Sequence, residues 1–265
     1  MELKRIVVAI DSAHRSDHAL EAAALLAEAL ESEIAGLFVE DSDLIAAAAL
    51  PFTRVTTPFG GLAVDVTGDT LAGELKQQAD AARRSLRRLS ESRRLKWSFE
   101  TRRGRIDREI RASALATDIV CLSTSEAAGG WAQVENAAAI LLGFPRRDLS
   151  AGDIVVLIDD PELGEPAVEI AAKLALRNRR RLKIILVSSA TQALSAWRQR
   201  TERLSGEGIN VDIGACEDCD PYRLLDAIGK SPVGFFISGI RTVAAPGWIK
   251  ACSATFRCPV LVLKG

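Results

Sequence analysis

The sequence has no long hydrophobic run. A membrane-spanning helix needs about 20 consecutive apolar residues, and the 265-residue sequence contains no such stretch. Lys4 and Arg5 precede an apolar segment that is too short for the core of a signal peptide. The five cysteines are an odd number without the spacing of a disulfide framework, which is typical of a reducing compartment. We therefore expect a cytoplasmic protein without a membrane span.

The sequence also lacks the motifs of common enzymes. It has no Walker A loop, no GxGxxG fingerprint, no GxSxG elbow and no HExxH helix. His14 and His18 are its only histidines, and neither has a second histidine or a cysteine close by as a metal partner. We therefore assign no catalytic and no metal-binding residue, and an enzyme is not favoured.

An excess of one charge is absent as well. The formal net charge of −1 excludes a globally basic nucleic-acid binder and argues against nucleic acid as a partner, although local patches are not excluded. One such patch is the window 83–111, which contains twelve Lys or Arg residues and four acids. A solvated surface is the simpler interpretation. The alternative is an adaptor that binds an anionic partner (RNA, a membrane surface or an acidic protein) through these arginines.

An internal repeat is the main positive feature. Residues 6–39 match residues 154–187 at a constant offset, so that Ile6 falls on Ile154 and Val39 falls on Val187. Each copy has the pattern of a buried strand, a turn, an amphipathic helix and a second buried strand. The sequence therefore predicts a duplicated α/β fold with two similar sheets, divided into domains 1–149 and 150–265. The first domain carries an insertion at 41–72 that the second lacks.

Strands alternating with helices predict parallel sheets covered on both faces. In the first half we expect strands at 5–10, 34–39, 97–102 and 119–123, and helices from Ser16 or Asp17, at 73–92, at 106–116 and at 131–142. In the second half we expect strands at 154–159, 183–188, 209–214, 233–238 and 259–263, and helices at 165–178, 191–206, 221–229 and 246–256. The first half shows no fifth strand to match 259–263.

These features resemble the universal stress protein family. The resemblance rests on the strand that ends in Asp11 or Asp159, the alanine-rich helix after it, and the closing strand that follows Cys258-Pro259. It covers nearly the whole chain as a tandem pair. It implies doubly wound five-stranded parallel sheets of the adenine nucleotide alpha hydrolase type, usually paired as dimers. It also implies ATP binding by an aspartate after strand one, a valine in strand two and a loop of pattern G-x-x-G-x(9)-G-(S/T).

The sequence departs from that loop in both halves. Asp11 and Val39 match in the first half, but Ser123, Glu126 and Asn136-Ala137 replace the glycines and the final Gly-Ser. A glutamate beside a triphosphate costs about 1–4 kcal/mol at intermediate dielectric. In the second half Asp159, Val187 and Gly239 match, whereas Thr242 replaces the second glycine and Cys252-Ser253 replaces Gly-Ser. The candidate cofactor-binding residues implied by the resemblance are Asp159, Val187, Gly239, Thr242, Ser253, Asp11 and Val39.

The leading hypothesis is a non-catalytic, universal-stress-like regulatory or interaction protein with degenerate nucleotide sites, no expected cofactor and an unknown protein partner. The alternative is an adenine-nucleotide-binding stress sensor or slow ATPase that uses ATP in the second half. Cys216 and Cys219, with Cys252 and Cys258, raise the options of zinc or redox chemistry, but ordinary cysteines are favoured because Cys258 begins a strand at the opposite edge.

Two structural predictions concern the ends of the elements. The apolar residues of the insertion (Leu44, Ile45, Leu50, Phe52, Phe59 and Leu62) should pack over or near the cleft of the first half. Val260–Leu263 should be a sheet edge that pairs with segment 137–149 of the same chain, as in an internal pseudo-dimer, although a homodimer through other surfaces stays open.

Overall fold

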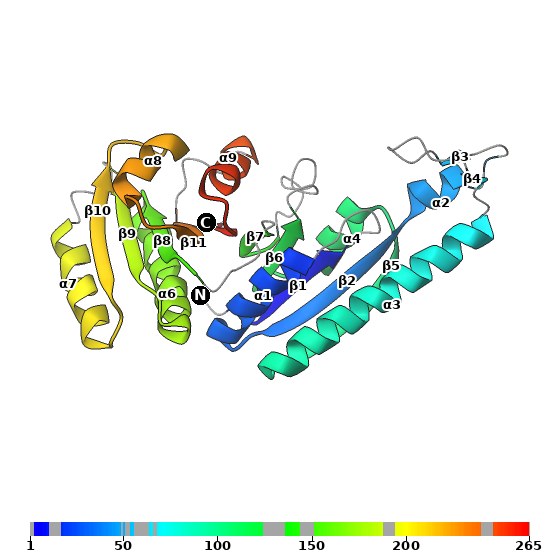
Figure 1. The fold of residues 1–265 in the computed structure, drawn as a ribbon, viewed down its shortest axis with the longest axis horizontal. Coiled ribbons are helices and arrows are strands. Elements are labelled where there is room, and N and C mark those ends of the chain that lie inside the picture. The colour runs from blue at the N-terminus through cyan, green and yellow to red at the C-terminus, as the bar shows by residue number, and fades with distance from the viewer. Residues whose placement is uncertain are drawn as a thin grey trace.

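The computed structural model describes residues 3–10, 17–48, 50, 54–55, 64–65, 68–123, 136–143, 151–187, 194–239 and 246–264. Within these residues ten strands form one continuous sheet (Figure 1). In chain order they are β1 (Arg5–Ile10), β2 (Glu33–Asp41), β5 (Trp97–Gly104), β6 (Asp118–Ser123), β7 (Ala139–Gly143), β8 (Asp153–Ile158), β9 (Leu182–Val187), β10 (Val211–Cys216), β11 (Val233–Gly239) and β12 (Val260–Leu263). Their order across the sheet is β10-β9-β8-β11-β12-β7-β6-β1-β2-β5.

The helices cover both faces of this sheet. They are α1 (Asp17–Leu30), α2 (Ser42–Ala48), α3 (Gly68–Arg93), α4 (Ile106–Ser113), α6 (Pro161–Asn178), α7 (Leu194–Gly206), α8 (Pro221–Ile228) and α9 (Pro246–Phe256). Helices α1, α3, α6 and α7 pack in one buried cluster, and α4, α8 and α9 pack in a second cluster with the alternate side chains of the strands. The expected α/β fold with doubly wound parallel strands is confirmed.

The two similar sheets expected from the sequence join edge to edge into one ten-stranded sheet. Neighbouring strands run parallel throughout, except that β12 pairs antiparallel with β7 at the middle of the sheet. Val260 lies opposite Leu142 and Leu263 lies opposite Ala139, so the last strand of the chain joins the two halves. The expected pairing of 260–263 with segment 137–149 within the chain is therefore confirmed.

The first half has the fifth strand that the sequence did not show. Residues 139–143 form β7 between β6 and β12, where a helix over 131–142 was expected; residues 131–135 lie outside the described residues. All five residues of β7 are buried. The alanine-rich sequence favours a helix locally, but two neighbouring strands supply hydrogen bonds on both sides of this segment, and this pairing outweighs the local propensity.

The described part of the insertion lies at the far end of β2. Helix α2 packs Ile45 and Ala48 against Leu71 and Leu75 of α3, which forms a small cluster of its own. The short strands β3 (Arg54–Val55) and β4 (Val64–Asp65) pair antiparallel. Two of the expected apolar contacts are wrong, because Leu44 and Leu50 are exposed. Phe52, Phe59 and Leu62 lie outside the described residues, and covering of the cleft stays a prediction.

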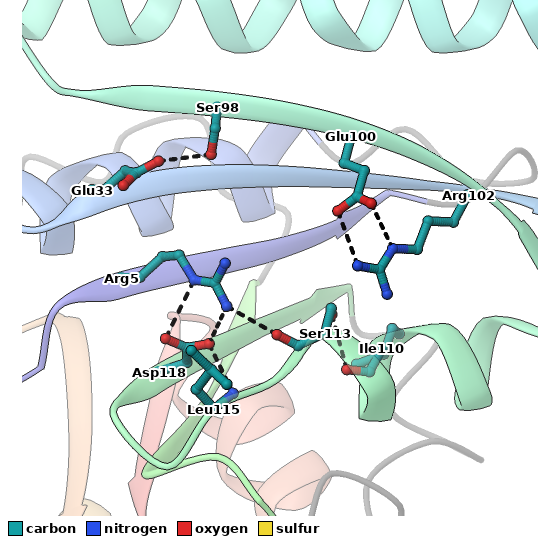
Figure 2. A network of polar contacts seen from close by, with 9 residues as sticks. All are labelled: Arg5, Glu33, Ser98, Glu100, Arg102, Ile110, Ser113, Leu115 and Asp118. Carbon is teal, nitrogen blue, oxygen red and sulfur yellow. Dashed lines mark hydrogen bonds and ion pairs between the residues drawn. The ribbon is translucent and has the colours of Figure 1, made fainter.

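A partly buried ion pair holds the amino ends of β1 and β6 together (Figure 2). Asp118 is only 1% exposed and accepts from Nη2 of Arg5 at 2.6 Å, from Nε of Arg5 at 3.3 Å and from the backbone N–H of Leu115 at 2.9 Å. Arg5 Nη2 also donates to the carbonyl of Ser113 at 2.9 Å. This network lies at the amino-terminal ends of the strands. Ligands bind in open α/β folds at the opposite, carboxyl-terminal ends. Among the described helices none is both long enough and apolar enough to cross a membrane.

Candidate functional site

The carboxyl ends of β8, β9 and β11 bring three of the predicted residues to one edge. Gly239 pairs with Ile158, and Ile158 pairs with Leu186, so these three residues lie side by side in the sheet. Asp159 and Val187 each follow this row by one residue. Helix α6 follows β8 on one face and α9 follows β11 on the other. The switch point where ligands bind in open α/β sheets therefore falls between β8 and β11. Asp159, Val187 and Gly239 form the candidate site.

Gly239 has a packing role at this edge. A Cβ atom built there would lie 2.7 Å from the carbonyl oxygen of Leu163 and 2.9 Å from the Cβ of Ala167. Both neighbours belong to α6, and the carbonyl is rigid backbone. Close approach of α6 to β11 therefore requires glycine here, whether or not a phosphate ever approaches the loop.

Two helix N-termini at this edge, those of α6 and α8, are already capped by carboxylates. Asp160 accepts from the backbone N–H of Glu162 at 2.7 Å and caps α6. Asp220 accepts from the N–H groups of Tyr222 and Arg223 at 2.9 and 3.2 Å and caps α8. Free N–H groups at a helix start attract phosphates, but these groups already have anionic partners. A phosphate would have to displace them or approach a like charge.

A tryptophan joins the two helices that follow β10 and β11. The indole Nε1 of Trp248, in the first turn of α9, donates to the carbonyl of Cys219 at 2.6 Å. Its ring also lies 6.2 Å from the ring of Phe236, centroid to centroid, at a tilt of 60°. This contact ties α9 to the loop before α8, on the same face of the sheet.

The thiols near this loop are held in the neutral form. Burial, and next the charge of Asp159, raise the pKa of Cys219 to about 12. Burial and Asp218 raise the pKa of Cys216 to about 11, and burial also raises the pKa of Cys252. Nucleophilic attack and metal binding both need the thiolate. No group of three or more His, Cys, Asp or Glu side chains in the described ranges is arranged for a metal ion.

The other predicted residues are not brought to this site. Ser253 lies in the second half of α9, is 1% exposed, and its hydroxyl has no hydrogen-bond partner among the described residues. Because α9 begins at Pro246, Ser253 is not at a helix start as the family loop implies. Thr242 lies outside the described residues.

In the first half only part of the equivalent set lies in the described residues. Val39 is buried near the end of β2, at the level of Arg102, while Asp11 and Glu126 lie outside the described residues. Asn136 and Ala137 run directly into β7, so the residues expected in place of Gly-Ser do not begin a helix. Their role as a nucleotide site stays a prediction.

Sequence reasoning missed Asp160, Asp220 and Trp248. The two aspartates had a usable signal, because Asp160-Pro161 and Asp220-Pro221 each place a capping residue before a proline at the first helical position. Trp248 had none, since its contact with Cys219 depends on how α8 and α9 pack.

Comparisons with known proteins support the fold. No protein-family model matches the sequence, and no curated protein matches it either. Among solved structures, a universal stress protein from Archaeoglobus fulgidus DSM 4304 superposes with a TM-score of 0.63 at 16% identity, covering 99% of this chain and 97% of that chain.

Two further structures cover the chain in the same way. A putative universal stress protein from Pseudomonas aeruginosa UCBPP-PA14 gives a TM-score of 0.57 at 16% identity, over 99% of this chain and 93% of that chain. The cytoplasmic domain of a prokaryotic cation chloride cotransporter gives 0.52 at 11% identity, over 98% and 94%. The resemblance inferred from Asp159, the alanine-rich helix and the closing strand is thus confirmed for the fold: over nearly its whole length, the chain has the architecture of universal stress proteins.

Proposed function

We propose that this chain is a non-catalytic, universal-stress-like regulatory or interaction protein whose nucleotide sites have degenerated. In this proposal residues 1–149 and 150–265 are two domains that stand to each other as an internal pseudo-dimer. The observation that supports it best is the pair of carboxylate caps, Asp160 on α6 and Asp220 on α8.

The caps oppose a nucleotide for an electrostatic reason. A triphosphate gains its binding energy from backbone N–H groups and from the positive end of a helix. Asp160 has already taken the N–H of Glu162 and adds a negative charge beside Asp159. A phosphate charge about 4 Å from a carboxylate would be repelled by about 4 kcal/mol at an effective dielectric constant of 20. The carboxyl-terminal ends of the strands at the candidate site therefore favour a neutral or cationic group over phosphate.

Ligand analysis of the purified chain tests this role. We expect denatured protein to release no stoichiometric adenine nucleotide by mass spectrometry, and calorimetric titration with Mg-ATP to give no saturable heat. Asp160→Ser keeps a capping oxygen but removes the charge, and Asp226→Ser, on the exposed side of α8, is the matched control.

Copurified ATP or ADP would contradict the proposal. If that nucleotide were lost in Val187→Arg and retained in Asp226→Ser, the chain would instead be an adenine-nucleotide sensor that works through the C-terminal half. Release of phosphate from ATP by the same protein, lost in the same variant, would make it a slow ATPase.

A further inference from the structure

The sheet divides the basic window 83–111 into separate surfaces. Helix α3 packs on one face through Leu86, whereas α4 packs on the other through Ile110, and β5 is the edge strand that runs past both. The arginines on and after β5 mostly have acidic partners: Arg102 with Glu100 at 2.8 Å, Arg103 with Glu40 at 3.9 Å, and Arg105 with Asp107 at 3.3 Å. The window is therefore not one continuous basic surface.

One part of it keeps most of its charge unneutralised. Arg83, Arg84, Arg87 and Arg88 lie on α3 and are all exposed; we call them the arginine ridge. Arg87 pairs with Glu91 at 2.8 Å, while the other three make no ion pair with any described residue. No acid occurs between Asp80 and Glu91, so these two turns of α3 are purely basic.

The fold gives no reason for the ridge. The cation that fixes α3 to the rest of the protein is Arg93, which binds Glu28 of α1 at 2.8 Å. The helix dipole favours cations only in the last turn, and at 1.5 Å per residue Arg83 lies about 15 Å before the end of α3. Like charges one turn apart, as in Arg84 and Arg88, destabilise a helix by about 0.2–0.5 kcal/mol per pair. The ridge therefore costs stability unless an anion neutralises it.

We propose that the arginine ridge binds the phosphodiester backbone of a double-helical nucleic acid. Guanidinium groups form paired hydrogen bonds with phosphate and stay charged at every physiological pH. Arginines one turn apart are spaced by about 6 Å along α3, which lets consecutive side chains follow a line of phosphates. In Figure 1 α3 is the long helix along the outer flank of the N-terminal half, where a rod-shaped partner can lie alongside it.

The surroundings of the ridge favour this partner over others. None of the large exposed hydrophobic side chains in the described residues belongs to α3, whereas protein interfaces bury an apolar centre and membrane-surface helices insert one. Trp97 and Phe99 are half-buried and pack in the core beneath α3, so they cannot stack on unpaired bases. A backbone contact without base stacking fits a double helix. The proposal deepens the proposed function, because it names a partner class for the interaction protein.

Fluorescence anisotropy with labelled duplexes tests the proposal. Blunt RNA and DNA duplexes of the same sequence are titrated with the full chain over a series of salt concentrations. Because log K falls by about 0.9 per log unit of salt for each phosphate neutralised, four arginines predict a slope of about −3 to −4. In Arg84→Gln/Arg88→Gln we expect the slope to fall by about 2 units and the affinity at low salt to drop about tenfold. Glutamine keeps the helix propensity of arginine.

The matched control removes two exposed arginines from the opposite end of the molecule. Arg198→Gln/Arg203→Gln on α7 loses the same charge and should bind within about twofold of the unaltered chain. Binding of either duplex, lost only in the α3 variant, supports the proposal, and the preferred duplex identifies the nucleic acid.

Three results would overturn it: no duplex binding at low salt, equal loss in both variants, or binding to phosphatidylserine vesicles with none to duplexes. Circular dichroism of both variants is the control that checks whether they stay folded. Loss of the duplex contact would leave the nucleotide titration of the proposed function unaffected, so the two failures are distinguishable.

Discussion

At the scale of single residues, the Arg5–Asp118 pair constrains the amino ends of β1 and β6 (Figure 2). Its two side chains differ in exposure, with 31% for Arg5 and 1% for Asp118. A buried carboxylate with a charged partner and a backbone N–H donor is satisfied, but its removal leaves the N–H of Leu115 without this acceptor and Arg5 with only the carbonyl of Ser113. Breaking the pair therefore costs more stability than the intact pair contributes in net terms.

Asp118→Ala should therefore lower the free energy of unfolding by about 3 kcal/mol, the lower end of the range for a broken buried pair, because Arg5 keeps some access to water. Glu33→Ala, which removes the exposed hydrogen bond to Ser98, should cost less than about 0.5 kcal/mol. Denaturant unfolding at neutral pH measures both. Similar values for the two variants would show that burial of Asp118 is not what makes the pair important.

At the residue scale, the sequence could place candidate residues in the fold only where strand ends determined their position. Asp159, Val187 and Gly239 follow from locating the ends of three strands, because parallel strands end at one edge. The position of Ser253 could not be predicted in this way. It was assigned by counting residues along the family loop, but α9 already begins at Pro246, so Ser253 lies inside the helix. The nucleotide role of all these residues remains a prediction.

At the scale of elements, strands in the interior of each half were predicted from continuous apolar runs, such as β8 and β9. β7 was missed, because its alanine-rich approach favours a helix and the strand forms only between β6 and β12. Residues 260–263 belong to the other half of the chain, and residues 118–123 are separated from β7 by an intervening segment. A strand whose conformation depends on two neighbouring strands cannot be recognised from its own residues alone.

Val262→Lys tests the role of this central pairing. Val262 is 2% exposed and lies opposite Ile140, so a lysine there buries a charge between the halves. We expect the free energy of unfolding to fall by at least about 3 kcal/mol, at every protein concentration, because the contact is within one chain. Thr101→Lys on the exposed side of β5 is the control and should change stability by less than about 0.5 kcal/mol. A Val262→Lys protein that is as stable as the control would refute the pairing.

At the scale of the whole molecule, the two halves share their cores. One buried cluster runs from Ile6 in β1 to Leu263 in β12, and the second likewise contains residues of both halves. Helices α1 and α6 also pack on each other across the middle of the sheet. Glu28 of α1 adds a polar connection, since it binds Arg93 at 2.8 Å and Arg177 of α6 at 3.0 Å. The halves should therefore resist unfolding together.

The Glu28 connection predicts a specific response to acid. Burial by itself raises the pKa of Glu28, but the hydrogen bonds and charges of Arg93 and Arg177 outweigh it and hold the pKa below its ordinary value of 4.5. Because the folded state binds this proton less readily than the unfolded chain, the stabilisation is complete above pH 4.5 and is lost as the pH falls through the folded-state pKa. Glu28→Gln should thus lower the free energy of unfolding at neutral pH by about 1–2 kcal/mol.

That deficit should shrink towards zero well below pH 4.5, where the native Glu28 is protonated as well. Glu169→Gln is the matched control, because Glu169 pairs with Lys173 on α6 but both side chains are half exposed. Its deficit should stay below about 0.5 kcal/mol at any pH. Denaturant unfolding of the three proteins across the acid range makes the comparison. If the Glu28→Gln deficit persisted unchanged in acid, the loss would come from altered packing of α1 on α6, and the ionised connection between the halves would contribute nothing.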